Sequence, residues 1–106
     1  MSKNDRSIDI NEILSVLETN KAKISKFGVK EIGIFGSYAR GDQTPQSDID
    51  IIVKFRDGEK SYKSFINLSF FLEELFNKRI DLLTEKSISP FIKPYIDKEV
   101  VFEKVS

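Results

Sequence analysis

Apolar residues recur along the chain with two periods, one typical of helices and one typical of strands. Helical spacing runs through residues 9–27 and again through residues 61–77. The apolar positions that define these helices are Ile10, Ile13, Leu14, Leu17 and Ile24 in the first and Phe65, Leu68, Leu72, Leu75 and Phe76 in the second. Short apolar runs of strand length occupy residues 30–35, 48–55, 79–84 and 100–105. The pattern therefore predicts a compact α/β fold.

Polar residues between these elements indicate where each one starts and stops. Asp9 is suited to cap the first helix, with Glu12 three residues later, and Gly28 is suited to end it. Residues 37–40 fit one or two helical turns, and residues 41–47 form a polar loop. The remaining connections are a turn at residues 56–59 and an irregular segment around Pro90 and Pro94.

The composition is that of an ordinary globular protein, with 40% hydrophobic and 32% charged residues. At this length we expect residues 1–106 to form a single domain with one core. No stretch approaches the roughly 20 apolar residues of a membrane span. The first residues, MSKNDRSIDINE, lack the apolar centre of a secretory signal. We therefore expect a cytoplasmic protein with no membrane insertion.

The chain contains neither cysteine nor histidine. A disulfide framework and a thiolate zinc site are excluded, and so are the most common general base and transition-metal ligand. Acid, base or metal chemistry must therefore use Asp, Glu, Lys or Tyr. The 17 basic and 17 acidic residues cancel, which argues against nucleic-acid binding as the main task.

Two carboxylates stand at the start of the predicted strand 48–55, where aspartate is disfavoured. Side chains alternate along a strand, so Asp48 and Asp50 should share one face. Like charges at this spacing raise each other's pKa, and a hard cation such as Mg²⁺ relieves their repulsion. If the next strand is a neighbour, Asp81 in RIDLLT completes a triad suited to two metal ions roughly 4 Å apart. The simpler interpretation is that each aspartate caps a turn or meets a surface lysine.

Gly36 and Ser37 close one predicted strand and open the next short helix. A glycine here lets an anion approach the backbone, and free amides at a helix start attract phosphate. Arg40, one turn later, is suited to bind phosphate through two hydrogen bonds. Simpler interpretations are a helix cap for Gly36-Ser37 and a surface pair with Asp42 for Arg40. The paired carboxylates ten residues further on favour phosphate chemistry.

The spaced motif Gly36-Ser37, ten residues, Asp48-x-Asp50 resembles the signature of the DNA polymerase beta nucleotidyltransferase superfamily. It looks most like the minimal nucleotidyltransferases, whose whole chain has about this length. The resemblance covers residues from about 10 to 104, and RIDLLT stands where that family carries its third acid. It implies a nucleotidyltransferase fold, a small mixed β-sheet flanked by helices.

The resemblance also implies roles for individual residues. Asp48, Asp50 and Asp81 would bind metal, with two Mg²⁺ ions, and Asp81 would help to activate an acceptor hydroxyl. Gly36 and Ser37 would bind the triphosphate of ATP. Minimal nucleotidyltransferases are commonly encoded beside a HEPN protein, an RNase-type toxin. Members are described as antitoxins that transfer AMP from ATP to a tyrosine of that toxin.

Three functions remain open. The first, which we favour, is AMP transfer to a HEPN partner. The second is nucleotidyl transfer to a small molecule or an RNA end, although 106 residues leave no room for the extra domains such enzymes usually carry. The third is a module that neutralises its partner by contact alone, for which three clustered carboxylates serve no purpose. The sequence leaves the acceptor, the preferred base and the homo- or hetero-oligomeric state undefined.

One apolar patch on helix 61–77 has no evident task in a monomer. Relative to Leu72 at the centre of the buried face, Ile66 and Phe70 lie about 120° and 160° away. The patch is either an interface, with a partner protein or a second copy of the chain, or is covered by C-terminal residues. Those residues are Phe91, Tyr95 and Ile96.

Overall fold

The structure, a computed structural model, describes residues 8–105. Residues 1–7, part of the stretch that argues against a secretory signal, lie outside the described residues.

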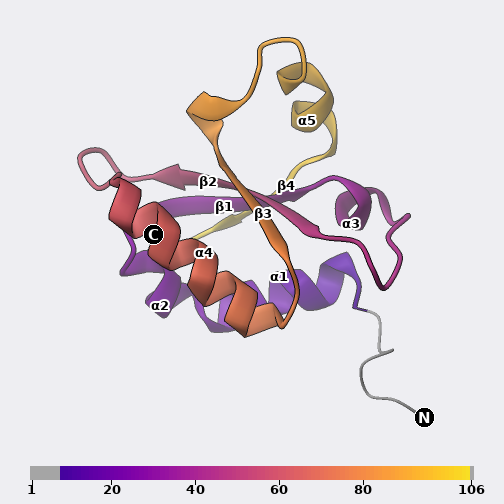
Figure 1. The fold of residues 1–106 in the computed structure, drawn as a ribbon, viewed down its shortest axis with the longest axis horizontal. Coiled ribbons are helices and arrows are strands. Elements are labelled where there is room, and N and C mark those ends of the chain that lie inside the picture. Colours follow the sequence, from indigo (N-terminus) through magenta and orange to yellow (C-terminus); the bar gives the residue numbers. More distant parts are fainter. Residues whose placement is uncertain (1–7, 106) are drawn as a thin grey trace.

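Four strands form one mixed sheet in the order β3-β2-β1-β4 (Figure 1). The strands are β1 (Val29–Phe35), β2 (Ile49–Phe55), β3 (Ile80–Thr84) and β4 (Val101–Lys104). β1 pairs antiparallel with both β2 and β4, whereas β2 and β3 run parallel. The expected mixed sheet is confirmed.

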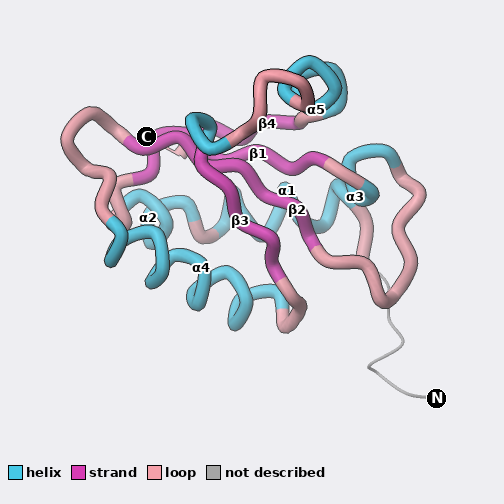
Figure 2. The backbone as a smooth tube through the Cα atoms, turned by 45° about the horizontal axis from the view of Figure 1, so that its top comes forward, coloured by secondary structure: helices cyan, strands magenta, loops and turns pink. Residues whose placement is uncertain are grey.

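The helices lie on both faces of this sheet. One face is covered by α1 (Ile10–Thr19), α2 (Lys21–Ser25) and α4 (Tyr62–Phe76), and α5 (Lys93–Glu99) lies on the other (Figures 1 and 2). The short helix α3 (Ser37–Arg40) follows β1 directly. A 3₁₀ turn, η2 (Glu85–Ser87), follows β3. None of the helices in residues 8–105 has the length and hydropathy that a membrane crossing requires.

Each face of the sheet has its own apolar cluster. The larger cluster lies beneath α1, α2 and α4 and includes Ile49, Ile51 and Val53 of β2. The smaller cluster joins Phe35, Ile52 and Ile96 on the α5 face. Alternate residues of β2 therefore face opposite sides, as the sequence predicts, and Asp50 shares the face of Ile52.

The first predicted helix, 9–27, is wrong in one respect, because the chain leaves helical geometry at Asn20 (φ −105°, ψ 12°). The Asn20 side-chain amide donates to the Val16 carbonyl at 2.8 Å, and the Thr19 hydroxyl donates to the Ser15 carbonyl at 2.9 Å. Such local side-chain bonds compete with regular helix geometry, so two helices replace one. The predicted start is confirmed, since Asp9 accepts a hydrogen bond from the Glu12 amide at 2.9 Å.

The segment expected to be irregular around Pro90 and Pro94 contains α5. Proline is tolerated in the first turn of a helix because no intrahelical bond needs its missing amide hydrogen. Pro94 lies in that first turn, so its presence does not prevent a helix.

The proposal that C-terminal residues cover the Ile66/Phe70 patch is also wrong. Ile96 is buried on the opposite face of the sheet from α4. Phe91 is itself 85% exposed, and Phe70 remains 64% exposed. Ile66 is half-buried.

Candidate active site

The sheet register places two of the predicted acids side by side. β2 and β3 are parallel neighbours, and Asp50 of β2 is directly paired with Asp81 of β3. Asp48 immediately precedes β2 and is exposed, as is Asp81. The condition for a triad, that these two strands be neighbours, is therefore met.

Asp50 is the acid most strongly affected by this arrangement. Burial first, then the charges of Asp81 and Asp48, raise the pKa of Asp50 from 3.8 to about 6. A hydrogen bond with Asp81 acts in the same direction, whereas the positive charge of Arg40 opposes it. A carboxylate in this position gains from any cation that approaches it.

The donor set fits Mg²⁺, which prefers carboxylate oxygens and completes its shell with water and phosphate oxygens. Among residues 8–105, however, no three acidic side chains are arranged so that they form a metal site on their own. The raised pKa of Asp50 shows that negative charge at the Asp50–Asp81 pair is unfavourable without a cation beside it. A metal held here would therefore depend on ligands that the substrate brings.

Gly36 occupies the position between β1 and α3 that only glycine fits. Its φ of 75° with ψ of −150° lies in a region that side chains essentially never adopt. A Cβ atom at Gly36 would also collide with the carboxylate of Asp50. Gly36 thus lets the acid cluster approach the end of β1, a role that the sequence did not indicate.

Ser37 and Arg40 lie at the two ends of α3. Gly36 is the N-cap of α3, which agrees with the simpler helix-cap interpretation of Gly36-Ser37. No side-chain hydrogen bond caps the helix, so the Ser37 hydroxyl does not serve as a cap. Arg40 donates to Asp42 through Nε at 3.2 Å, the surface pair that the sequence allowed. Asp42 and Glu99 both raise the pKa of Arg40.

Glu99 is a site residue that sequence reasoning missed. Its Oε2 accepts a hydrogen bond from the Gly36 amide at 2.6 Å, although 63 positions separate the two residues. Both carboxylate oxygens also accept from Arg40 Nη1, at 3.1 and 3.3 Å. No local pattern predicts this contact, because it depends on how α5 packs against the sheet.

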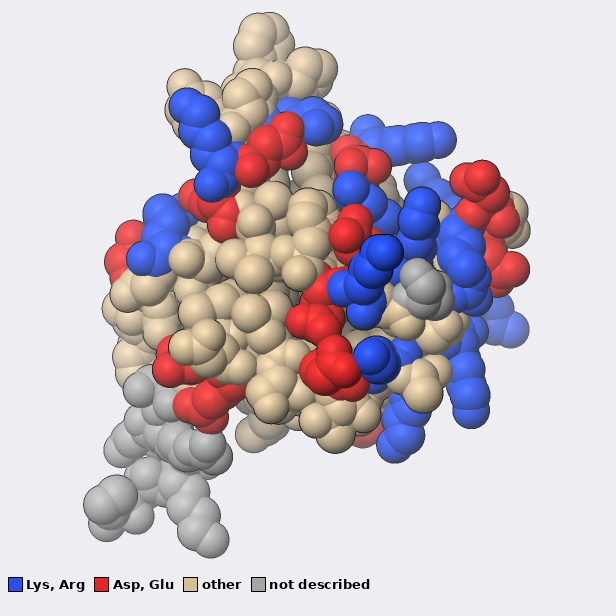
Figure 3. All heavy atoms as spheres, turned by 180° about the vertical axis from the view of Figure 1, so that it is seen from behind, with Lys and Arg blue, Asp and Glu red and all other residues tan. Residues whose placement is uncertain are grey.

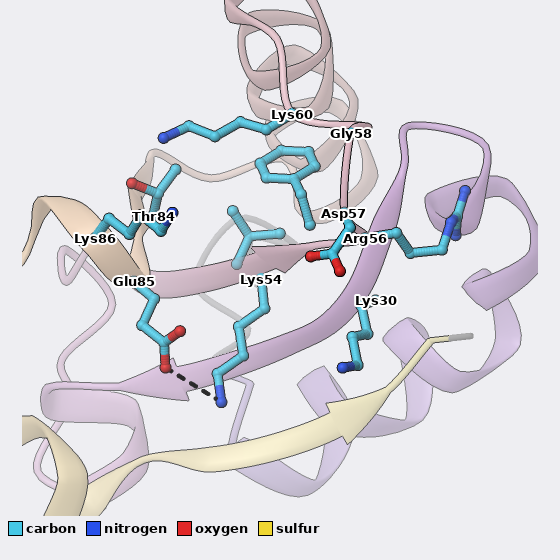
Figure 4. A pocket seen from close by; sticks show the side chains of 11 residues that line it. Lys30, Lys54, Arg56, Asp57, Gly58, Lys60, Thr84, Glu85 and Lys86 are labelled. Carbon is cyan, nitrogen blue, oxygen red and sulfur yellow. Dashed lines mark ion pairs between the residues drawn. The ribbon is translucent and has the colours of Figure 1, made fainter.

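A separate basic cavity lies at the opposite ends of β2 and β3 from the acids (Figure 4). It measures about 330 Å³, and its lining includes Lys30, Lys54, Arg56, Lys60 and Lys86. Lys54 is held by Glu31 and Glu85, each at 3.3 Å. Arg56 points away from the cavity and donates to Ser25 and Val29. Part of this positive charge is therefore structural.

The surface charge is divided in the same way, with basic residues towards one end of the molecule and acidic residues towards the other. Figure 3 shows the Lys and Arg side chains visible from behind gathered towards the end of the molecule that carries α2. The end of the sheet with α3 and the paired aspartates is instead rich in carboxylates close to one arginine. This arrangement suits a cation-assisted phosphate site better than a simple basic phosphate pocket.

Comparison with known proteins gives a consistent result. The nucleotidyltransferase domain model matches residues 13–105. Protein adenylyltransferase MntA of Thermococcus cleftensis is 40% identical over 96 residues, which cover 90% of this chain and 96% of the relative. A candidate protein adenylyltransferase of Methanocaldococcus jannaschii is 38% identical over 96 residues, 88% of this chain and 96% of that one.

Solved structures share the fold. A candidate minimal nucleotidyltransferase superposes with a TM-score of 0.72 and 26% identity, covering 89% of this chain and 95% of its own. The chain also resembles a complex of a tri-AMPylated Shewanella oneidensis HEPN toxin with its MNT antitoxin. In that case the TM-score is 0.52, with 22% identity over 84% of this chain and 71% of the other. At that identity the likeness concerns the fold alone.

Proposed function

The chain belongs to the nucleotidyltransferase domain family, and we propose that it transfers AMP from ATP to a hydroxyl group of a partner protein. The observation that carries the proposal is the register pairing of Asp50 with Asp81 beside Gly36 and Arg40. Relatives that match nearly the full chain are named as protein adenylyltransferases, which supports AMP as the transferred group.

The site residues divide into two groups with different tasks. Asp48, Asp50 and Asp81 would hold Mg²⁺, which when bound neutralises charge on the phosphates. The backbone at Gly36 and Ser37, with the Arg40 guanidinium, would hold the triphosphate. We expect two ions, as the motif implies.

The reaction conserves every atom of ATP and acceptor. The acceptor oxygen attacks the α-phosphorus, the bond from that phosphorus to the bridging oxygen breaks, and pyrophosphate leaves. The hydroxyl proton passes to a carboxylate, for which we propose Asp81, at the exposed edge of the acid pair. The pairing of β2 with β3 keeps Asp50 beside it in a fixed position in the sheet.

For the acceptor we propose a tyrosine of a HEPN-family protein encoded nearby, so that the chain acts as an antitoxin. Solved structures with a similar fold include toxin–antitoxin complexes, and one of those toxins carries three AMP groups. We also propose a cytoplasmic location, where ATP and such a partner would both be present.

The decisive experiment combines the protein, ATP, Mg²⁺ and the neighbouring HEPN gene product, followed by intact-mass analysis of both chains. The expected result is a mass gain of whole AMP units on the partner. Asp81→Asn should abolish the gain, whereas Asp57→Asn, at an exposed turn away from the acids, should not. Complex formation with no mass gain would favour neutralisation by contact alone, and transfer only to small molecules would favour the other alternative.

A further inference from the structure

The Glu99 carboxylate occupies the anion position of the proposed phosphate site. Gly36 donates its amide hydrogen to Glu99 at 2.6 Å, and Arg40 Nη1 contacts both carboxylate oxygens. A carboxylate held by one backbone amide and one guanidinium has the same partners that a phosphate oxygen pair would use at this site. The Glu99 side chain is partly buried, with 22% exposed, and so is its hydrogen bond with the Gly36 amide.

We propose that Glu99 is a displaceable substitute for phosphate, which must leave Gly36 and Arg40 before the triphosphate can bind there. The inference rests on the proposed function and adds a residue that sets nucleotide affinity. One amide hydrogen makes one strong hydrogen bond, so Glu99 and a phosphate oxygen compete for Gly36. Two anions against the same arginine also repel each other.

The position of Glu99 in the fold allows such a displacement. It is the last residue of α5, a helix of 7 residues that buries only Ile96. The following residue, Val100, is already extended and leads into β4. Withdrawal of Glu99 therefore needs movement of only this side chain and a short helix end, while the sheet stays in place.

The other charged groups around the Glu99 contact also favour competition between Glu99 and the triphosphate. Arg40 is already paired with Asp42. Asp50 lies against Gly36, since a Cβ added at Gly36 would collide with its carboxylate. A triphosphate entering this site meets Glu99, Asp42 and the acid cluster together. Glu99 is the one of these carboxylates that holds both the Gly36 amide and the Arg40 guanidinium.

The test is the affinity for ATP and for inorganic tripolyphosphate, each measured by titration calorimetry with Mg²⁺. Glu99→Gln keeps the shape but removes the charge, and we expect about tenfold tighter binding of both ligands, equivalent to about 1.4 kcal/mol. Asp97→Asn is the matched control, because Asp97 lies on the same helix and pairs with Lys93. It should leave both affinities unchanged. Glu99→Asp, which retracts the carboxylate by one methylene, should give a smaller gain.

A second readout follows the helix itself. Hydrogen exchange at the Ile96 and Val100 amides, which bond to the Ile92 and Ile96 carbonyls, should quicken when ATP binds the parent protein. In Glu99→Gln these amides should exchange quickly without ATP, and ATP should change them little.

The outcomes separate the inference from the proposed function. If parent and Glu99→Gln bind ATP equally, or the variant binds more weakly, the site stands and the role of Glu99 as a competitor is overturned. If neither protein binds ATP or tripolyphosphate, the nucleotide site itself is misplaced and both proposals fail. Binding by the variant alone supports both.

Discussion

At the residue scale, Asp50 links the electrostatics of the site to the stability of the fold. Its pKa rises from 3.8 to about 6 on folding, chiefly through burial and the Asp81 charge. The folded chain therefore binds this proton more tightly than the unfolded chain between these two values. Stability then falls as pH rises from 3.8 to about 6 and stays reduced above that range.

Asp50→Asn should remove this loss of folding stability at higher pH. In metal-free buffer at pH 8 we expect the variant to be more stable than the parent by about 1 kcal/mol, a value reduced for solvent screening because Asp50 is only half-buried. Thermal melting in chelator from pH 4 to pH 8 measures it, and the gain should vanish near pH 4. AMP transfer should be abolished at every pH.

Mg²⁺ and a distant acid provide the controls for this prediction. Mg²⁺ should raise the melting temperature of the parent at pH 8 and leave that of Asp50→Asn unchanged, because the ion relieves the same repulsion. Asp57→Asn should follow the parent throughout. A variant that melts well below the parent in chelator would show that Asp50 supports the fold instead of straining it.

Gly36 carries a second prediction at this scale. Gly36→Ala imposes both a disfavoured backbone conformation and a collision with Asp50, and we expect it to cost about 3 kcal/mol of unfolding free energy. Gly41→Ala is the control, since Gly41 also has positive φ, at 83°, but no atom lies within 4 Å of its added Cβ. It should cost about 1 kcal/mol. Urea titration compares them, and equal losses would mean that Asp50 moves aside freely.

At the element scale, the apolar patterns predict every strand and the long helix α4. β1, β2, β3 and α4 each bury an apolar face in the larger cluster. Periodicity did not predict the helix boundaries where a side chain bonds to the backbone, nor a helix that buries little apolar surface. Asn20 divides the first helix through a hydrogen bond to Val16. The sequence did not indicate α5, because this helix buries only Ile96 and carries Pro94 in its first turn.

The outer face of α4 carries the prediction at this scale. Because Phe70 is 64% exposed, Phe70→Glu should leave the unfolding free energy within about 0.5 kcal/mol of the parent value. If Phe70 and Ile66 contact the partner, the variant loses complex formation on a sizing column and still binds ATP. Phe91→Glu, another exposed phenylalanine on the opposite side of the sheet, is the control and should retain the complex. Loss of the complex in Phe91→Glu alone would place the interface near α5.

At the scale of the whole molecule, strand pairing converts sequence spacing into proximity. The antiparallel pairing of Phe35 with Asp50 brings the Gly36 end of β1 to the acids, and the parallel pairing of β2 and β3 adds Asp81. The pairing of Asp50 with Asp81 follows from that register. The Gly36–Glu99 contact joins residues 63 positions apart and depends on the packing of α5, which no local pattern encodes. The sequence thus predicted that the acids lie near the glycine turn, but it did not indicate Glu99, whose carboxylate contacts Gly36 and Arg40.

The two faces of the sheet should also differ in stability. Within residues 8–105, fourteen buried residues form the larger cluster, against three in the cluster beneath α5. Leu72→Ala, in the larger cluster, should cost about 3 kcal/mol and quicken hydrogen exchange throughout the molecule. Ile96→Ala, in the smaller one, should mainly release α5.

Native-state hydrogen exchange tests the difference. In Ile96→Ala the Val100 amide, which bonds to the Ile96 carbonyl, should exchange much faster. The Ile49 amide, which bonds to the Arg79 carbonyl beside the acid pair, should keep nearly the parent rate. A helix that opens locally while the sheet stays closed can withdraw Glu99 from Gly36 without moving Asp50 or Asp81. Equal acceleration at Val100 and Ile49 would instead make the molecule one cooperative unit, in which Glu99 cannot leave without disturbing the acids.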